Sequence, residues 1–332
     1  MVFSRPTFRQ ACFMTIGIVG LFAFMAFSVF VRNTPNRPVR FGITYSTTYA
    51  TFLGLDPLPT YKALIDELGV RAIRFPVYWS ELEPERGMFR FETLDPFVAY
   101  AEEKDVKLTL AVGQKVPRWP ECFVPDWAKA LPAPEQHAAT KDMLQAVLNR
   151  YKDSPAIERW QVENEPFLPF GECTQITNEE LSDRIRFVRA QDTRPVQLTA
   201  SGEMGPWKSL AKRADVFGIS VYRKTWNRTF GYFTYPLSPL FYRARFALIA
   251  GTDARHIISE LQAEPWFSED IRARSTSYWY EQFRAEDFVE HVQFAKDIGA
   301  SEAYLWGAEW WVYLKQQGEP RLWNAAQDLF LP

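Results

Sequence analysis

Residues 157–166 read IERWQVENEP, and this stretch decides how the rest of the chain is interpreted. It begins with the alternating apolar residues of a buried strand, yet it closes on Glu163, Asn164 and Glu165 before a proline. Neighbouring carboxylates oppose each other's ionisation, so a strand that only fills a core should not end in this way. The segment therefore either ends in solvent or brings carboxylates to a place where they serve chemistry.

Seven other short apolar runs have the same strand pattern, and stretches with apolar residues at helical spacing lie between them. The eight predicted strands are residues 41–45, 71–78, 106–113, 157–164, 195–201, 215–222, 255–260 and 302–307. The clearest helical patterns are residues 59–69, 94–105, 138–152, 178–191 and 285–299. Eight strand-helix units after residue 40 predict one (β/α)₈ barrel domain over residues 41–332, a fold that needs about 250 residues plus insertions. Residues 224–249, rich in Tyr, Phe and Pro, are expected to form an insertion in the sixth unit.

The first 40 residues are expected to lie outside the barrel. Residues 11–31 form a 21-residue run without a charge, flanked by Arg5, Arg9 and Arg32, which is long enough to cross a bilayer as a helix. We interpret residues 1–40 as an N-terminal transmembrane signal anchor with its linker, which places the barrel outside the cytoplasm. The alternative is a cleaved signal peptide, with residues 26–28 (AFS) as a loose small-x-small cleavage site.

Composition argues against a nucleic-acid partner. The formal net charge is −2 and the pI is about 6.1, so the chain lacks the basic surface that phosphate binding requires. The chain contains 12 Trp and 14 Tyr. Flat aromatic faces can hold the apolar faces of sugars, although core packing explains many of these residues equally well.

The three cysteines are consistent with an oxidising compartment. Cys12 lies in the apolar N-terminal run, which leaves Cys122 and Cys173 either as a disulfide or as two free thiols. No group of Cys and His has the spacing of metal ligands, and the three histidines are scattered along the chain. We therefore predict neither a catalytic metal nor a cofactor.

Polar side chains recur where the predicted strands end. In barrels of this kind the active site lies at the carboxyl ends of the strands. A single Glu in such a place is more often a solvated residue or a helix cap, but a ring of polar residues at one mouth predicts a functional site. Besides the end of the fourth strand, the strand-end residues are Arg74, Gln114, Glu203, Tyr222, Glu260 and Trp306.

These motifs resemble clan A of the glycoside hydrolases. WQVENEP, with Asn164 and Glu165, and IISELQ, with Glu260, resemble the strand ends that carry the clan's two catalytic carboxylates. Residues 74–95 (RFPVYWSELEPERGMFRFETLD) resemble the second strand and following loop of the cellulase-like and β-galactosidase-like branches. The resemblance extends from about residue 41 to the end of the chain, and it implies a retaining glycosidase that acts on a carbohydrate.

The resemblance assigns a role to each carboxylate. Glu165 corresponds to the acid/base that protonates the leaving oxygen, and Glu260 corresponds to the nucleophile, which needs a different environment. Arg74 and Tyr222 would keep Glu260 ionised, since a cation and a hydrogen-bond donor both favour the charged form. For Arg74 the alternative is a purely structural ion pair.

Two further residues take substrate-binding roles by resemblance. Asn164 would donate a hydrogen bond to the sugar 2-hydroxyl, or else it serves only as a turn residue before Pro166. Trp306 would stack under the sugar, or else it belongs to the core. Glu163 has the strand parity of Glu165, and we expect it to raise the proton affinity of that residue.

The chain departs from the family pattern in two places. The third strand ends in AVGQKVPRW, where many cellulase-like members carry a histidine, and the sixth strand has SVY without the histidine that commonly precedes the tyrosine. Because of these departures, the family resemblance does not identify the sugar that this protein acts on. Glu264 in QAEPW is a rival for Glu260, and Glu309 is a weaker one.

The leading interpretation is a membrane-anchored retaining glycosidase that cleaves β-linked bonds of a periplasmic or extracellular poly- or oligosaccharide. A transglycosylase would use the same residues and pass the sugar to another hydroxyl. A sugar-binding barrel without turnover is a third alternative, because a fold does not guarantee chemistry.

Overall fold

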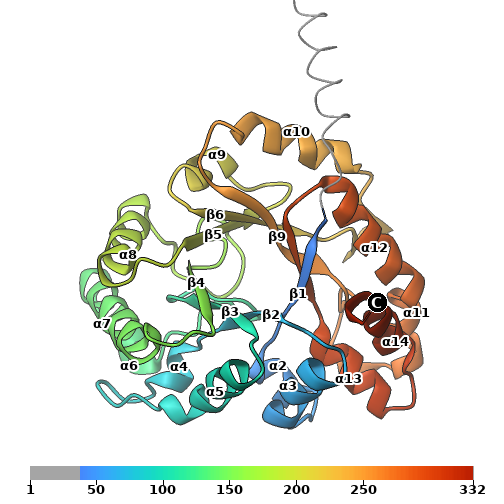
Figure 1. Ribbon diagram of the computed structural model, residues 1–332, viewed down its shortest axis with the longest axis horizontal. Coiled ribbons are helices and arrows are strands. Elements are labelled where there is room, and N and C mark those ends of the chain that lie inside the picture. The colour runs from blue at the N-terminus through green and yellow to red at the C-terminus, as the bar shows by residue number, and fades with distance from the viewer. Residues whose placement is uncertain (1–37, 332) are drawn as a thin grey trace, which may run out of the picture.

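The computed structural model describes residues 38–331, and within them eight parallel strands close into a barrel (Figure 1). The order around the barrel is β1-β10-β9-β6-β5-β4-β3-β2. The (β/α)₈ barrel predicted from the sequence is therefore confirmed, and each predicted strand overlaps one barrel strand. These strands are β1 (Arg40–Thr44), β2 (Ala72–Pro76), β3 (Lys107–Val112), β4 (Ile157–Val162), β5 (Val196–Ser201), β6 (Val216–Val221), β9 (Arg255–Gln262) and β10 (Glu302–Trp306).

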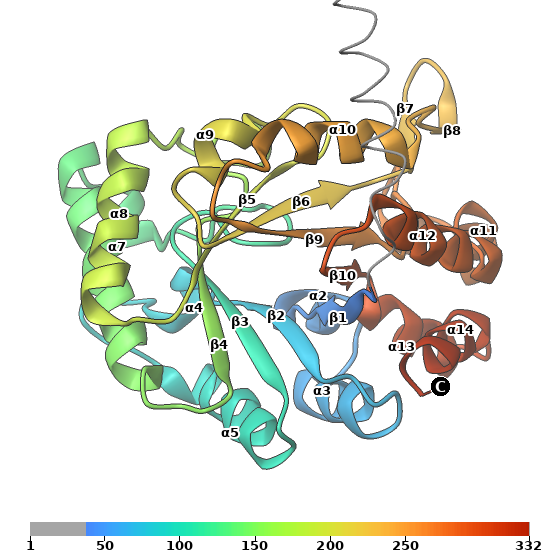
Figure 2. The ribbon, with the colours of Figure 1, turned by 45° about the horizontal axis from the view of Figure 1, so that its top comes forward.

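Helices surround the strands on the outside of the barrel, as the tilted view in Figure 2 shows. The five predicted helical patterns correspond to α3 (Pro57–Asp66), α5 (Asp95–Glu103), α7 (Ala133–Tyr151), α8 (Asn178–Gln191) and α12 (Ala285–Ile298). Their apolar faces pack on the strands, because both faces of a parallel sheet must be covered. The remaining helical elements are α2 (Thr47–Phe52), α4 (Trp79–Leu82), η1 (Phe91–Thr93), α6 (Asp126–Lys129), α9 (Trp207–Ala211), α10 (Pro239–Ile249), η2 (Ile271–Ala273), α11 (Thr276–Gln282), α13 (Ala308–Gln316) and α14 (Arg321–Phe330).

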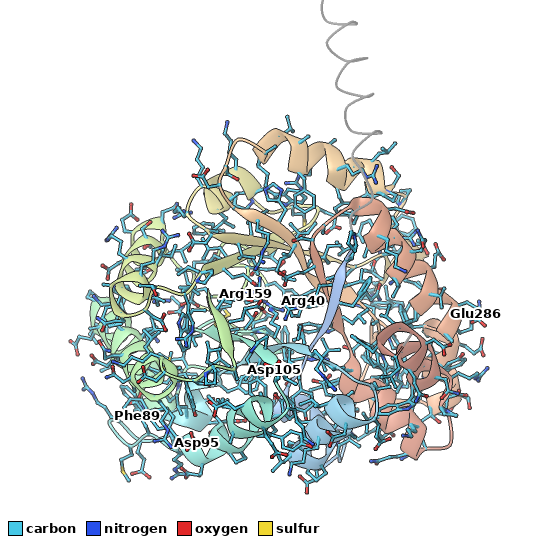
Figure 3. The ribbon with its side chains drawn as sticks, viewed as in Figure 1. Arg40, Phe89, Asp95, Asp105, Arg159 and Glu286 are labelled. Carbon is cyan, nitrogen blue, oxygen red and sulfur yellow. A yellow bond between two sulfur atoms is a disulfide. The ribbon has the colours of Figure 1, made fainter. Side chains whose placement is uncertain are left out.

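Polar side chains fill part of the barrel interior. Near the amino ends of the strands, the fully buried Arg159 pairs with Glu302 and donates to the Tyr304 hydroxyl at 2.9 Å. Arg159 lies near the barrel axis in Figure 3. This network closes the amino end of the barrel, so the space for a ligand lies at the opposite end.

The insertion expected in the sixth unit is confirmed only for its first part, because α10 is the helix of that unit, between β6 and β9. Residues 224–249 form a two-stranded antiparallel hairpin, β7 (Lys224–Asn227) and β8 (Gly231–Thr234), followed by α10. Helix α10 packs against α9 and α12 on the outside of the barrel (Figure 1).

The predicted membrane segment, residues 11–31, lies outside the described residues. Among residues 38–331, no helix has the length and apolar character that a membrane crossing requires. The N-terminal transmembrane helix therefore stays a prediction from the sequence.

Candidate active site

A cleft of about 760 Å³ opens at the carboxyl ends of the strands. Loops that follow β3, β4, β5 and β9 contribute to its walls. Four of the six predicted site residues line it: Glu165, Tyr222, Glu260 and Trp306. The other two, Arg74 and Asn164, are buried directly beneath these side chains and hydrogen-bonded to one another.

The unusual end of β4 is a turn that separates two carboxylates. Glu163 and Glu165 both have positive φ angles, 60° and 42°, which cost about 1–3 kcal/mol each for residues with a side chain. Glu163 is fully buried and accepts from the Lys115 amide at 2.7 Å and from the Arg184 guanidinium. Gly113 is required beside it, because a Cβ there would lie 2.3 Å from the Glu163 carboxylate.

This geometry corrects the role expected for Glu163. Its charge is balanced by Arg184 of α8, and it is absent from the groups that raise the pKa of Glu165. Glu163 therefore ties the β3 loop and α8 to the end of β4, while the turn directs Glu165 into the cleft. Of the two carboxylates at the end of the strand, Glu163 has a structural role and Glu165 belongs to the candidate active site.

Glu260 is held by a cation and a phenol. Arg74 on β2 contacts its Oε1 through Nη1 at 2.8 Å, and the Tyr222 hydroxyl donates to its Oε2 at 2.9 Å. Burial and the nearby Glu260 charge raise the pKa of Tyr222 well above its usual value, so the phenol stays protonated and donates. Both contacts favour the ionised carboxylate.

Glu165 lies in a contrasting environment. Burial, followed by the charge of Glu260, raises its pKa to about 7. Ser220 on β6 donates to its Oε1, and its backbone amide donates to the Thr199 hydroxyl at 2.9 Å. The site thus holds one carboxyl in contact with a cation and a phenol, and a second whose raised pKa leaves it partly protonated near neutral pH.

Asn164 connects the end of β4 to β2, to β5 and to the loop after β3. Its Oδ1 accepts from Arg74 at 2.5 Å and from the Thr199 hydroxyl at 3.1 Å. Its Nδ2 donates to Glu121 at 3.1 Å. These contacts fix the orientation of the amide, so Asn164 is more than a turn residue.

Trp306 lines the cleft although only 8% of it is exposed. The Arg118 guanidinium lies 4.2 Å from its ring centroid and 3.8 Å from that of Tyr49. The side chain therefore belongs both to the cleft wall and to a packed cluster.

The two rival carboxylates are bound in that cluster. Arg118 contacts Glu264 at 2.5 Å and Glu309 at 3.1 Å, and Glu309 also accepts from the Ser46 amide. In the described structure neither rival is hydrogen-bonded to Arg74 or Tyr222, the two side chains that contact Glu260.

Several site residues were missed by the sequence reasoning. Ser220 is two residues before Tyr222 on β6, and strand alternation could have placed both on one face. Glu121 and Arg118 lie in the loop after β3, where no periodicity predicts which side chains reach the cleft. The disulfide between Cys122 and Cys173 is formed, with a Cα–Cα distance of 5.3 Å, and joins this loop to the loop after β4.

The two departures from the family pattern take structural roles. Gln114 accepts from Arg184 at 3.0 Å and donates to the Thr174 carbonyl at 3.2 Å, both outside the cleft. Val221, the residue before the tyrosine of β6, is fully buried in the core.

The fold and the pair of carboxyl groups define the class of the protein: it is a glycoside hydrolase with a (β/α)₈ barrel. A model of the cellulase family, glycosyl hydrolase family 5, matches residues 36–203, which is half of the chain. The chain belongs to glycosyl hydrolase family 5.

The chain is also similar to two β-galactosidases over a third of its length. The chain is 28% identical over 130 residues to β-galactosidase BgaB of Geobacillus sp. (strain Y412MC61) and 26% identical over 128 residues to β-galactosidase LacZ of Heyndrickxia coagulans. Each match covers 33% of this chain and only 19% of the relative.

Solved structures share the fold. Native xylanase 10B from Thermotoga maritima is similar with a TM-score of 0.60 and 15% identity, over 88% of this chain and 94% of the other. GH5_18 from Bifidobacterium longum subsp. longum is similar with a TM-score of 0.55 and 15% identity, over 81% and 69%. At these identities the likeness concerns the fold alone.

Proposed function

We propose that the protein is a retaining glycosidase that cleaves β-linked bonds in an extracytoplasmic poly- or oligosaccharide by double displacement. In this proposal Glu260 is the nucleophile and Glu165 is the acid/base. The observation that carries the proposal is the contrast between two carboxyl groups that line one cleft: Arg74 and Tyr222 contact one, and burial and the charge of the first raise the pKa of the other to about 7.

In the first step, the ionised Glu260 attacks the anomeric carbon while Glu165 transfers its proton to the glycosidic oxygen, which leaves. The Glu260 charge is then consumed in the ester bond. Because that charge raises the pKa of Glu165, its loss lowers the proton affinity of Glu165 and prepares it to act as a base. Glu165 then takes a proton from water, which attacks the sugar and restores Glu260.

The substrate is proposed to extend beyond one sugar. Trp119 and Phe170 line the cleft with 62% and 44% of their surface exposed, and their ring centroids are 5.8 Å apart. Exposed aromatic faces in a cleft suit the apolar faces of sugars. The β-linkage is supported by the similarity to two β-galactosidases, which act on that anomer by name.

Azide rescue tests the roles of the two glutamates. The Glu165→Ala variant should retain its first step on 2,4-dinitrophenyl β-glycosides, stall at the glycosyl-enzyme, and regain turnover in azide, which attacks without a general base. The product should be a β-glycosyl azide. The Glu260→Ala variant should lose turnover by several orders of magnitude on every substrate. An α-configured product from the wild-type enzyme, or an active Glu260→Ala variant, would reject the assignment.

A further inference from the structure

A third carboxyl group, Glu121, lines the cleft beside the proposed catalytic pair. It is 6% exposed, and its Oε2 accepts from Asn164 Nδ2 at 3.1 Å. Among residues 38–331, no side chain or backbone group donates a hydrogen bond to its other oxygen, Oε1. The mechanism above uses neither oxygen.

The loop around Glu121 is built to hold it in place. Its backbone amide donates to the Arg118 carbonyl at 2.6 Å, and its carbonyl accepts from Val116 at 2.8 Å. The next residue, Cys122, forms the disulfide to Cys173. A Cβ at Gly171 would lie 2.6 Å from the Glu121 Cβ, so the two joined loops approach closely here. The positive φ of Glu121, 72°, is thus maintained by its surroundings.

The charge environment favours a neutral Glu121. Burial, then the charges of Glu260 and Glu165, raise its pKa well above the usual value. Lys115 and the Asn164 amide act in the opposite direction. A protonated carboxyl can donate one hydrogen bond and accept others, which suits a sugar hydroxyl.

Asn164 determines which part of a sugar lies near Glu121. Its Oδ1 is occupied by Arg74, Thr199 and Gln161, so only Nδ2 remains for a ligand. One hydrogen of Nδ2 goes to Glu121, which leaves one for the sugar 2-hydroxyl, the contact that the sequence resemblance implies for Asn164. The neighbouring hydroxyl, away from the anomeric carbon, is the one at C3.

We propose that Glu121 is a substrate-binding residue that recognises the 3-hydroxyl of the sugar whose anomeric carbon reacts, beside the 2-hydroxyl bound by Asn164. The inference rests on the proposed glycosidase function. It predicts that the substrates of the enzyme carry a free hydroxyl at C3 of this sugar. It also gives the two disulfide-joined loops a role in substrate selection.

Substrate deletion combined with mutation tests this contact. The probe is the p-nitrophenyl β-glycoside that the wild type cleaves fastest among the glucoside, galactoside, mannoside and xyloside, together with its 2-deoxy and 3-deoxy forms. Glu121→Ala should lower kcat/KM on the parent substrate by about tenfold to hundredfold, because the sugar 3-hydroxyl loses its hydrogen-bond partner in the site. On the 3-deoxy substrate the same substitution should change kcat/KM by less than about threefold.

The controls separate recognition from a structural role. On the 2-deoxy substrate, the Glu121→Ala loss should remain at about tenfold to hundredfold, because the 3-hydroxyl is still present. Glu172→Gln, which changes an exposed carboxyl on the other of the two disulfide-joined loops, should leave all rates unchanged. If Glu121→Ala does not fold, Glu121→Leu provides the same comparison, since it fills the space without a hydrogen-bonding group.

Equal losses on the parent and 3-deoxy substrates would show that Glu121 only shapes the site, and this would overturn the inference. Unchanged rates for both Glu121 variants would overturn it too. A wild-type protein that cleaves neither a glycoside of the panel nor a β-linked poly- or oligosaccharide would instead contradict the proposed function itself.

Discussion

At the scale of single residues, the site depends on contacts between side chains of different strands: Arg74 and Tyr222 contact Glu260, and Ser220 contacts Glu165. Strand ends predicted that Glu165 and Glu260 would meet at one mouth, since parallel strands of a barrel share an active-site face. The contacts of Ser220 with Glu165 and of Glu121 with Asn164 could not be predicted, because they join elements far apart in the sequence. The role predicted for Glu163 was wrong for a related reason. The alternation of side chains along a strand no longer predicts their direction where the backbone turns to positive φ.

The raised pKa of Glu165 predicts how activity depends on pH. As the proposed general acid, Glu165 must be protonated, so kcat/KM on substrates with poor leaving groups should fall as pH rises through about 7. The falling limb should disappear when Glu165→Ala is assayed with a 2,4-dinitrophenyl glycoside, whose departure needs no proton. A limb that persists in this variant near the same pH would assign the titration to another group.

At the scale of elements, the periodic segments were predictable and the loops were not. The eight strands and the five amphipathic helices follow from their apolar patterns. The sequence patterns predict no element for helices α2, α13 and α14, and they predict the β7–β8 hairpin only as part of an insertion. The long loop from residue 113 to 125 is fixed by tertiary contacts, including the disulfide, which leave no periodic trace in sequence.

The ion pair between Glu163 and Arg184 joins the end of β4 to α8. Arg184→Met should leave a buried carboxylate without its cation and reduce the free energy of unfolding by about 3–5 kcal/mol. Urea unfolding would measure this loss. Arg186→Met, at an exposed position on the same helix, should change stability by less than about 1 kcal/mol. The double variant Glu163→Gln/Arg184→Met should recover part of the loss, and no recovery would show that Arg184 acts mainly through packing.

At the scale of the whole molecule, the residues that the structure describes form one barrel. The prediction about cellular location depends on the segment that precedes this barrel in the sequence. The uncharged run of residues 11–31 predicts that the full-length protein sediments with membranes and resists extraction by salt and by alkaline carbonate. Immunoblotting of the fractions would measure this. A soluble mature form that begins near Val29 would indicate a cleaved signal peptide instead.

The central claim is that Glu260 forms the covalent bond to the sugar, and trapping that bond tests it most directly. A 2,4-dinitrophenyl 2-deoxy-2-fluoro-β-glycoside of the preferred sugar should accumulate as an ester, because fluorine slows both steps and the good leaving group restores the first. Mass spectrometry of the intact protein should show one sugar added, and peptide sequencing should place it on Glu260. An ester on Glu264, Glu309 or Glu121, or no ester on an enzyme that cleaves the parent glycoside, would contradict the claim.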